Sequence, residues 1–252
     1  MQSRKRIFQA FGHRLSRFNW VFKEFGLIQA IRLLIEVLVM EFDAEWVRSW
    51  RDRRFDRRYR VTTSGFRTLH ELGLSGSAKE SHDYRGTPVT LFNAALSQSL
   101  RIDWSLFEFV DYGSGMGKAL LLAARFPFRR ITGVEFSAEL HEVAKANIAK
   151  WRLPDQRCRK VRSVLADAST WPLPQGHCLL YFFNPFRESL LRAVLRGIVR
   201  AARPGREIVI VYIHPSFPEV FAEFPELKEV VQVAFRHSLY SIYNVEQAPH
   251  PL

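Results

Sequence analysis

Cysteine is scarce in this sequence, and its scarcity argues against two kinds of small domain. The 252 residues include two cysteines, Cys158 and Cys178, whose spacing fits no paired-cysteine motif. A disulfide framework or a cysteine zinc site is therefore not expected, and the two thiols suit a reducing compartment. The eight histidines also lack the spacing of metal ligands, so we expect no metal.

Long apolar runs are lacking as well. The most apolar stretch, residues 25–40, follows the basic residues Arg4, Lys5 and Arg6, an order that could suggest a signal or a membrane span. This stretch is shorter than the roughly 20 residues that cross a bilayer, charges interrupt it, and no small-residue cleavage site follows. We therefore expect an amphipathic helix in a cytoplasmic protein, with peripheral attachment to a membrane surface as the alternative.

Acidic residues are outnumbered by basic ones. The chain has 37 Lys and Arg against 25 Asp and Glu, a net charge of +12 and a pI of about 10.1. This balance favours a nucleic acid, an acidic protein or an anionic membrane as partner, and it does not choose among them. Apolar residues make up 47% of the chain, which excludes wholesale disorder and leaves room for one α/β domain with an appendage.

The first 82 residues have the composition of an extension that precedes the main domain. Apolar residues between 27 and 42 recur at helical spacing, which favours a helix packed on the protein or lying on a membrane. The Arg-rich segment 48–60 also contains aromatic residues. Its arginines could bind phosphates while its aromatic residues stack on bases. Alternatively, it could be a solvated helix whose aromatic residues belong to the core. Residues 61–82 are rich in Gly, Ser and Thr and read as a linker, so the predicted domains are 1–82 and 83–252.

Strand and helix patterns alternate through the second half of the chain. Such alternation implies right-handed crossovers and a mostly parallel sheet. Two short β-like runs at the end, 230–235 and 239–245, predict a hairpin. The predicted fold is α/β, with a Rossmann-like, seven-stranded sheet that is parallel except for this C-terminal antiparallel hairpin. The other expected strands are 107–112, 130–135, 160–164, 177–183 and 206–213, and the expected helices are 116–126, 137–151 and 187–202.

A glycine-rich turn follows the strand at 107–112 and distinguishes between three nucleotide-binding motifs. The dinucleotide motif needs a third glycine where Lys118 stands. The phosphate-binding P-loop needs glycine in place of Tyr112 and Ser or Thr in place of Ala119. What remains is Asp111-x-Gly113-x-Gly115-x-Gly117, with Ser114 inside it.

Acids at the strand ends suit a cofactor that carries a nucleoside and a positive charge. The Asp111 carboxylate can interact with a positively charged amino-acid end of the cofactor, directly or through water. Gly113 and Gly115 let the backbone approach the ligand. Glu135 ends the next strand, 24 residues after Asp111, where a carboxylate can accept both ribose hydroxyls. Phe136 follows and can pack on the adenine.

Two further elements complete the predicted cofactor site. Asp167-Ala168 follows the third strand, where the acid could receive the adenine amino group. Upstream of the first strand, Thr87-Pro88 predicts the start of a helix over about 88–99, with Thr87 as its N-cap. Tyr84 and Thr87 could cover the amino-acid end of the cofactor.

The turn after the fourth strand reads Asn184-Pro185-Phe186. An Asn side-chain oxygen and the neighbouring carbonyl can align a target nitrogen, and the aromatic ring can pack against the substrate. The same three residues would also make an ordinary turn before a helix. His214 ends the fifth strand and is a candidate base or a structural residue, and Lys118 reads as a solvated charge.

These motifs resemble those of class I S-adenosylmethionine (SAM) methyltransferases. The similarity runs from Tyr84 to Val245 and rests on Asp111–Lys118, Gly133–Ser137 and Asn184–Phe186. It is nearest to the branch of the disruptor-of-telomeric-silencing histone lysine methyltransferases and the small bacterial and mitochondrial lysine methyltransferases. The resemblance implies SAM as cofactor and in-line methyl transfer. This sequence departs from that branch at Tyr112, where an apolar residue is usual, in the Asn-Pro-Phe element itself and in its helical N-terminus.

Three functions follow as hypotheses. The leading one is N-methylation of a protein lysine or another amine. The second is adenine methylation of a nucleic acid held by Arg51, Arg53, Arg54, Arg57 and Arg58. The third is a non-enzymatic SAM-binding or membrane-surface interaction module.

Overall fold

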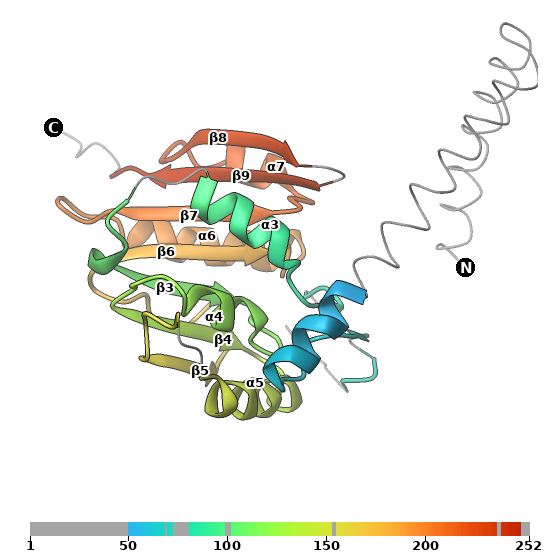
Figure 1. Cartoon of the computed structure of the whole chain (residues 1–252). Helices are drawn as coiled ribbons and strands as arrows, with labels where there is room; N and C mark the ends of the chain where they lie inside the picture. Colours follow the sequence, from blue (N-terminus) through green and yellow to red (C-terminus); the bar gives the residue numbers. More distant parts are fainter. Residues whose placement is uncertain are drawn as a thin grey trace, which may run out of the picture. The chain divides into compact units, whose positions relative to one another are not determined.

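The computed structural model describes residues 50–68, 70–72, 81–98, 102–152, 155–235 and 238–247 (Figure 1). The chain divides into two compact units, residues 1–51 and 52–252. The predicted helix built on residues 25–40 and 27–42 lies outside the described residues. The elements that the structure describes belong almost entirely to the second unit.

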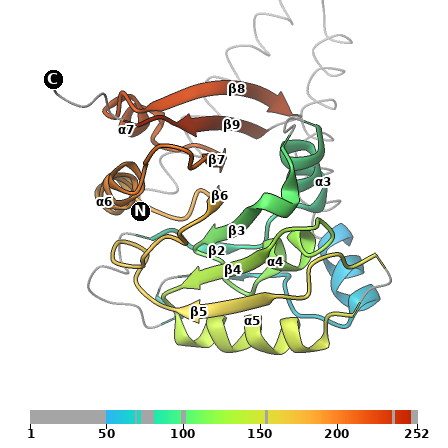
Figure 2. The same ribbon diagram turned by 90° about the vertical axis from the view of Figure 1, so that its left-hand side faces the viewer.

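The second unit is built on a seven-stranded sheet with the order β5-β4-β3-β6-β7-β9-β8 (Figure 1). Strands β3 to β7 pair in parallel, while β9 is antiparallel to both β7 and β8, so the predicted parallel sheet with a terminal hairpin is confirmed. The hairpin extends the sheet beyond β7 (Figure 2). The strands are β3 Phe107–Tyr112, β4 Arg130–Glu135, β5 Val161–Leu165, β6 His177–Phe183, β7 Ile208–Ile213, β8 Leu227–Phe235 and β9 Ser238–Val245.

Alternation along the strands divides the apolar residues between two cores. In β3, Phe107 and Phe109 belong to one core, whereas Val110 and Tyr112 belong to the other. Successive side chains of a strand point to opposite faces, so a strand buried on both faces contributes to two cores. Tyr112, the departure from the family pattern, is a core residue whose ring stacks on Phe182 with centroids 5.1 Å apart.

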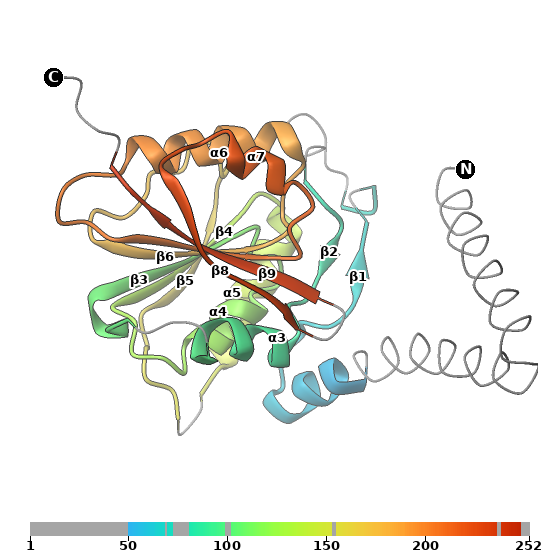
Figure 3. The same cartoon turned by 90° about the horizontal axis from the view of Figure 1, so that it is seen from above.

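Helices cover both faces of the sheet. Figure 3 shows α3, α4 and α5 on one side and α6 with α7 on the other. The bounds are α3 Val89–Asn93, α4 Lys118–Ala123, α5 Ala138–Lys150, α6 Glu188–Arg200 and α7 Pro218–Ala222. Short elements that the sequence did not predict are β1 Phe66–Arg67, which pairs with β2 Tyr84–Arg85, and the 3-10 turn Trp104–Leu106.

The helix expected over 88–99 is shorter than predicted and begins differently. Helix α3 ends at Asn93 and continues as a π-helical turn, Ala94–Gln98. Pro88, not Thr87, holds the N-cap position, and no side chain caps the helix. Thr87 is instead a buried residue that lines a pocket beside the glycine loop.

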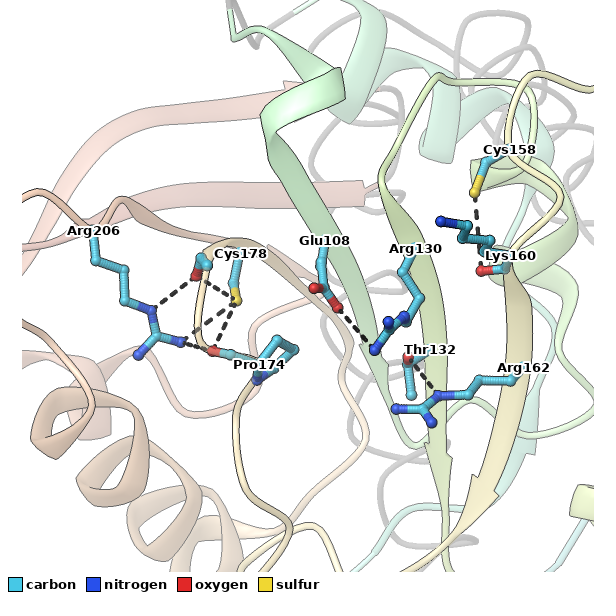
Figure 4. A network of polar contacts seen from close by, with 10 residues as sticks. Glu108, Arg130, Thr132, Cys158, Lys160, Arg162, Pro174, Cys178 and Arg206 are labelled. Atoms are coloured by element: carbon cyan, nitrogen blue, oxygen red, sulfur yellow. Dashed lines mark hydrogen bonds and ion pairs between the residues drawn. The ribbon is translucent and has the colours of Figure 1, made fainter.

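Polar contacts near the amino ends of the strands tie the loops to the sheet (Figure 4). The Arg206 guanidinium donates to the carbonyls of Pro174, of Gly176 at 2.9 Å and of Ala201 at 2.6 Å. One charged group thereby donates to three backbone acceptors, two of which also accept from Cys178 Sγ.

Membrane spans and metal clusters are both lacking in the part of the chain that the structure describes. No described helix combines the length and apolar character that a membrane crossing requires. Within the same residues, no three His, Cys, Asp or Glu side chains are grouped so that they could hold a metal ion.

Residues 50–59 are helical, and residues 52–59 contact the start of helix α4, which follows the glycine-rich turn. Lys118, predicted to be solvated, is instead buried, with 1% of its side chain exposed, and its Nζ lies 2.5 Å from Asp52 Oδ1. The Lys118 ammonium also lies 5.2 Å from the centre of the Phe55 ring. Asn147 of α5 completes the attachment, since its side chain accepts from Thr62 N and donates to the Thr62 carbonyl, both at 2.8 Å.

We predict that Asp52→Asn lowers the free energy of unfolding by about 3 kcal/mol, because it leaves the Lys118 charge buried without its partner. The control is Asp155→Asn, which breaks an ion pair with Arg125 whose side chains are 37% and 52% exposed. That variant should cost less than about 1 kcal/mol. Urea unfolding at neutral pH measures both, and equal losses would contradict a special role for the buried pair.

Candidate cofactor and active site

The glycine loop after β3 allows two distant segments to touch it. Gly113 and Gly115 have φ values of 72° and 53°, in the region that favours glycine. A Cβ on Gly113 would lie 2.6 Å from the Pro185 Cβ, and one on Gly115 would overlap the Tyr84 ring. The loop therefore carries glycine both for its backbone conformation and for close packing.

A single cleft collects almost all the residues predicted to bind the cofactor. Its empty volume, including space open to solvent, is about 910 Å³, which is in the range of small-molecule sites. Gly117 is absent from its lining, because it precedes α4 with a φ of 81° and faces Ala144 of α5. The predicted residues that line the cleft are Tyr84, Thr87, Asp111, Gly113, Ser114, Gly115, Glu135, Phe136, Asp167, Ala168, Asn184, Pro185 and Phe186.

Glu135 joins the glycine loop to the start of α5. Its Oε2 accepts from Gly115 N at 2.7 Å and its Oε1 accepts from Ser137 N at 2.8 Å. Burial raises the pKa of Glu135, while these backbone N–H groups act in the opposite direction. A carboxylate can accept about four hydrogen bonds, so each oxygen keeps capacity for a ribose hydroxyl.

Asp111 is a buried acid with a second acid nearby. It is 3% exposed, and burial, followed by the charge of Glu135, raises its pKa well above the ordinary value. A cationic ligand would offset both effects, which is what the amino-acid end and sulfonium of SAM would provide. Ser114 Oγ, buried in the same cleft with no hydrogen-bond partner among the described residues, adds a polar atom for such a ligand. The residues present therefore fit SAM.

Asp167 shapes the turn after β5. Its Oδ1 accepts from Ser169 N at 2.8 Å and from Ser169 Oγ at 2.7 Å. The Asp167 carbonyl accepts from Thr170 N and Trp171 N. These bonds fix the Asp167-Ala168 segment, which lines the same cleft as the half-exposed Phe136.

Tyr84 covers the glycine loop from the other side. Its ring packs on Gly115, and its hydroxyl donates to the Thr63 carbonyl at 2.8 Å. Burial raises the pKa of this hydroxyl, so Tyr84 stays neutral. Because strand β2 also pairs with β1, this tyrosine fixes residues 63–67 against the cleft.

The Asn184-Pro185-Phe186 turn also lines the cleft. Asn184 has a φ of 45°, and its Nδ2 donates to Ser216 Oγ at 2.8 Å while the Tyr212 hydroxyl donates to its Oδ1 at 3.3 Å. The Pro185 carbonyl accepts from His82 N at 3.0 Å. The side-chain amide of Asn184 is thus held by two hydroxyls, and the turn supplies two oxygen acceptors at the cleft lining.

The sequence did not identify His82, which also lines the cleft. It lies at the end of the Gly- and Ser-rich segment that predicts a linker, and that composition hid it. His214, the histidine predicted from its place at a strand end, is absent from the cleft lining, and its backbone N–H donates to the Leu239 carbonyl at 2.9 Å. The only local signal for His82 is its position two residues before Tyr84.

We predict that Gly115→Ala weakens SAM binding at least about tenfold, because the added methyl displaces Tyr84 from the loop. Gly205→Ala is the matched control: Gly205 also has a positive φ, 73°, but a Cβ there meets no atom within 4 Å. Both variants carry the backbone strain, and calorimetry with SAM should separate them. Equal affinities in the two variants would contradict the packing argument.

We also predict that Asp111→Asn stabilises the ligand-free protein at neutral pH while weakening SAM binding by about 10- to 100-fold. An acid whose pKa is raised by folding contributes stability below its unfolded pKa and loses it as pH rises through the folded pKa. The stability gain of the variant should therefore shrink as the pH is lowered.

The control for this prediction is Asp103→Asn. Asp103 is an exposed N-cap whose pKa is lowered by hydrogen bonds from Ser105, so its neutralisation should act in the destabilising direction. Thermal unfolding between acid and neutral pH checks both signs. A destabilised Asp111→Asn protein at neutral pH would show that the buried charge is compensated.

Comparison with known proteins supports the same chemistry. Residues 109–205, less than half of the chain, match the family model described as a methyltransferase domain. No curated protein is a significant match. An RNA methyltransferase from Salinibacter ruber, solved with S-adenosyl-L-homocysteine, is 18% identical, with 66% of this chain and 97% of that chain covered and a TM-score of 0.43.

For two other solved structures, the match covers only about half of the solved chain. TrmN from Thermus thermophilus is 17% identical, with 71% of this chain and 52% of that chain covered and a TM-score of 0.48. The mitomycin 7-O-methyltransferase MmcR is 14% identical, with 64% and 55% covered and a TM-score of 0.48. Because these TM-scores are all below 0.5, the conclusion rests on the family match and the site. The methyltransferase-domain match, the sheet order and the acid-lined cleft at the glycine loop together identify a SAM-dependent methyltransferase with a class I fold.

Proposed function

We propose that this methyltransferase transfers its methyl group to an amine, with a protein lysine as the acceptor. The observation that carries the proposal is the Asn184-Pro185-Phe186 turn, which lies in the same cleft as the glycine loop. Gly113 packs directly against Pro185, so the acceptor turn and the cofactor loop are in contact.

The oxygens of this turn suit a nitrogen that carries hydrogens. Asn184 Oδ1 already accepts from Tyr212, and the Pro185 carbonyl already accepts from His82, but each oxygen has a second lone pair. An amine could donate to both oxygens while its own lone pair points toward the transferred methyl. Alignment of this kind can supply on the order of 7–11 kcal/mol of a displacement barrier.

The acceptor must reach the methyl group as a neutral amine. Phe186 is 4% exposed, and it lines the cleft together with Phe183 and Leu190. Apolar surroundings lower the pKa of an ammonium because they disfavour its charged form. The aromatic wall would therefore help a lysine to lose its proton, while SAM, when bound, supplies the electrophilic methyl.

A second candidate is methylation of an adenine amine in a nucleic acid. The helix at residues 50–59 favours it because its two acids turn inward: Asp52 pairs with Lys118, and Asp56 accepts from Thr63 N and Ser64 N. The side chains exposed around these acids are those of Arg53, Arg54, Arg57, Arg58 and Arg60. Such a surface would bind phosphates, with affinity that falls steeply as salt is raised.

Transfer of labelled methyl from SAM into a cell lysate tests both candidates. We expect the full-length protein to label lysate protein in an acid-stable form at lysine. Label recovered in nucleic acid and removed by nuclease would favour the adenine candidate. A protein that binds SAM and labels only hydroxyl or carboxyl groups would overturn N-methylation.

Variants of Asn184 connect this activity to the turn. Asn184→Gly accepts the positive φ without strain and removes the side chain, so we expect unchanged SAM affinity and a rate of methyl transfer about 100-fold lower. Asn184→Asp keeps an oxygen acceptor and should retain more activity than Asn184→Gly. If Asn184→Gly transfers methyl at the wild-type rate, the amide has no part in aligning the acceptor.

A further inference from the structure

We propose that His82 is the base of the reaction and accepts, at Nε2, the proton that the methyl acceptor releases. This inference rests on the proposed function, since only a nitrogen or another protonated acceptor releases a proton on methylation. It assigns the role to a histidine in residues 81–85, a segment that lines the cleft and is here called the strap, and not to the histidine at a strand end.

The backbone of the strap fixes His82 beside the acceptor turn. Ser81 forms an isolated antiparallel bridge with Phe186, and His82 N donates to the Pro185 carbonyl at 3.0 Å. His82 lines the same cleft as Asn184 and the glycine loop. The histidine is therefore held against the residues proposed to align the acceptor.

The His82 ring is also fixed, and one of its nitrogens is available. The ring stacks on Phe217, with centroids 6.3 Å apart and an interplanar angle of 21°. Phe217 directly follows Ser216, whose hydroxyl accepts from the Asn184 amide, so the segment that contacts the His82 ring also contacts the acceptor turn. Nε2 is buried and has no hydrogen-bond partner among the residues that the structure describes.

An unpartnered buried nitrogen requires an explanation, because burying a polar atom without a partner costs stability. A neutral imidazole offers a lone pair on one nitrogen, and because His82 lines the cleft, this lone pair is a candidate proton acceptor for a ligand bound there.

Burial is the main reason that the imidazole stays neutral. Burial lowers the pKa of His82, and the positive charge of Arg187 lowers it further, while the Phe186 backbone and the Asp83 charge act in the opposite direction. His82 is consequently unprotonated and ready to act as a base at neutral pH.

The proton balance of the step requires such a group. The acceptor ammonium transfers one proton to His82 Nε2 and becomes a neutral amine. The amine nitrogen uses its lone pair to bond the methyl carbon, the carbon–sulfur bond breaks with its electron pair remaining on sulfur, and the product is a methylated ammonium. His82 later releases its proton to solvent. One proton is passed for each methyl group, and no further reactant is needed.

The test compares His82→Gln with His214→Gln in the full-length protein. In His82→Gln the backbone N–H at this position can still donate to the Pro185 carbonyl, so the strap keeps its bridge. We expect SAM affinity to be unchanged in both variants, by calorimetry. The initial rate of label transfer into lysate protein at pH 7 should fall about 100-fold in His82→Gln and stay within about twofold in His214→Gln.

Two readouts separate a base from a structural residue. Below the His82 pKa, the wild-type rate should fall more steeply with decreasing pH than the His82→Gln rate, because the variant has lost one titrating group. In the wild type, 15N-histidine NMR at pH 7 should show His82 Nε2 without a proton.

Each contrary outcome has a distinct meaning. If the wild type binds SAM and methylates no amine, the proposed function fails and the His82 role fails with it. If the wild type is active and His82→Gln has the same pH dependence, only the His82 role is overturned. A protonated Nε2 in the NMR spectrum at pH 7 overturns it as well, whatever the rates are.

Discussion

The structure of the site depends on the absence of two side chains from the loop after β3. Gly113 and Gly115 let Pro185 and Tyr84 lie directly on the loop backbone. These two residues come from segments about 100 positions apart in the sequence, and each carries part of the cleft wall. Because these glycines have no side chains, the acceptor turn and the strap contact the loop directly, and these contacts set their positions relative to the cofactor loop. This explains why a motif that binds a cofactor also sets the position of the chemistry.

The same loop is held by the Glu135 carboxylate, whose charged form is disfavoured by its burial in the fold. Glu135 accepts from the N–H groups of Gly115 and Ser137, and so connects β4, the loop and α5. With Asp111 close by, the fold buries two acids whose pKa values are both raised. Buried like charges reduce stability, and they persist where a ligand of opposite charge offsets the cost. The affinity for a cationic cofactor and the instability of the empty site have the same origin.

The sheet and most of the residues that line the cleft could be predicted from sequence because their signals are local. The strands are buried on both faces, so each reads as a short apolar run, and the predicted bounds of β3, β4 and β6 agree with the structure. The site is harder to predict where it depends on contacts between distant segments. His82 lies in a segment whose composition indicates a linker, and only the bridge to Phe186 places it in the cleft. The roles of the predicted site residues stay predictions.

Lys118 shows how the chain can lack the third glycine of the dinucleotide motif and still form the same strand–loop–helix unit. In a dinucleotide motif, the third glycine allows the helix to pack closely while the loop surrounds a pyrophosphate. SAM has no pyrophosphate, so a larger residue can occupy this position. The lysine ammonium pairs with Asp52 and lies over the Phe55 ring, which makes this residue a buried anchor for the helix at 50–59. A sequence pattern cannot reveal this ion pair, because Asp52 lies 66 positions away from Lys118. Asp52 is also surrounded by many arginines in the sequence, so nothing marks it as the partner of Lys118. The residue that rules out one cofactor is thus the residue that fastens the arginine-rich helix to the site of another.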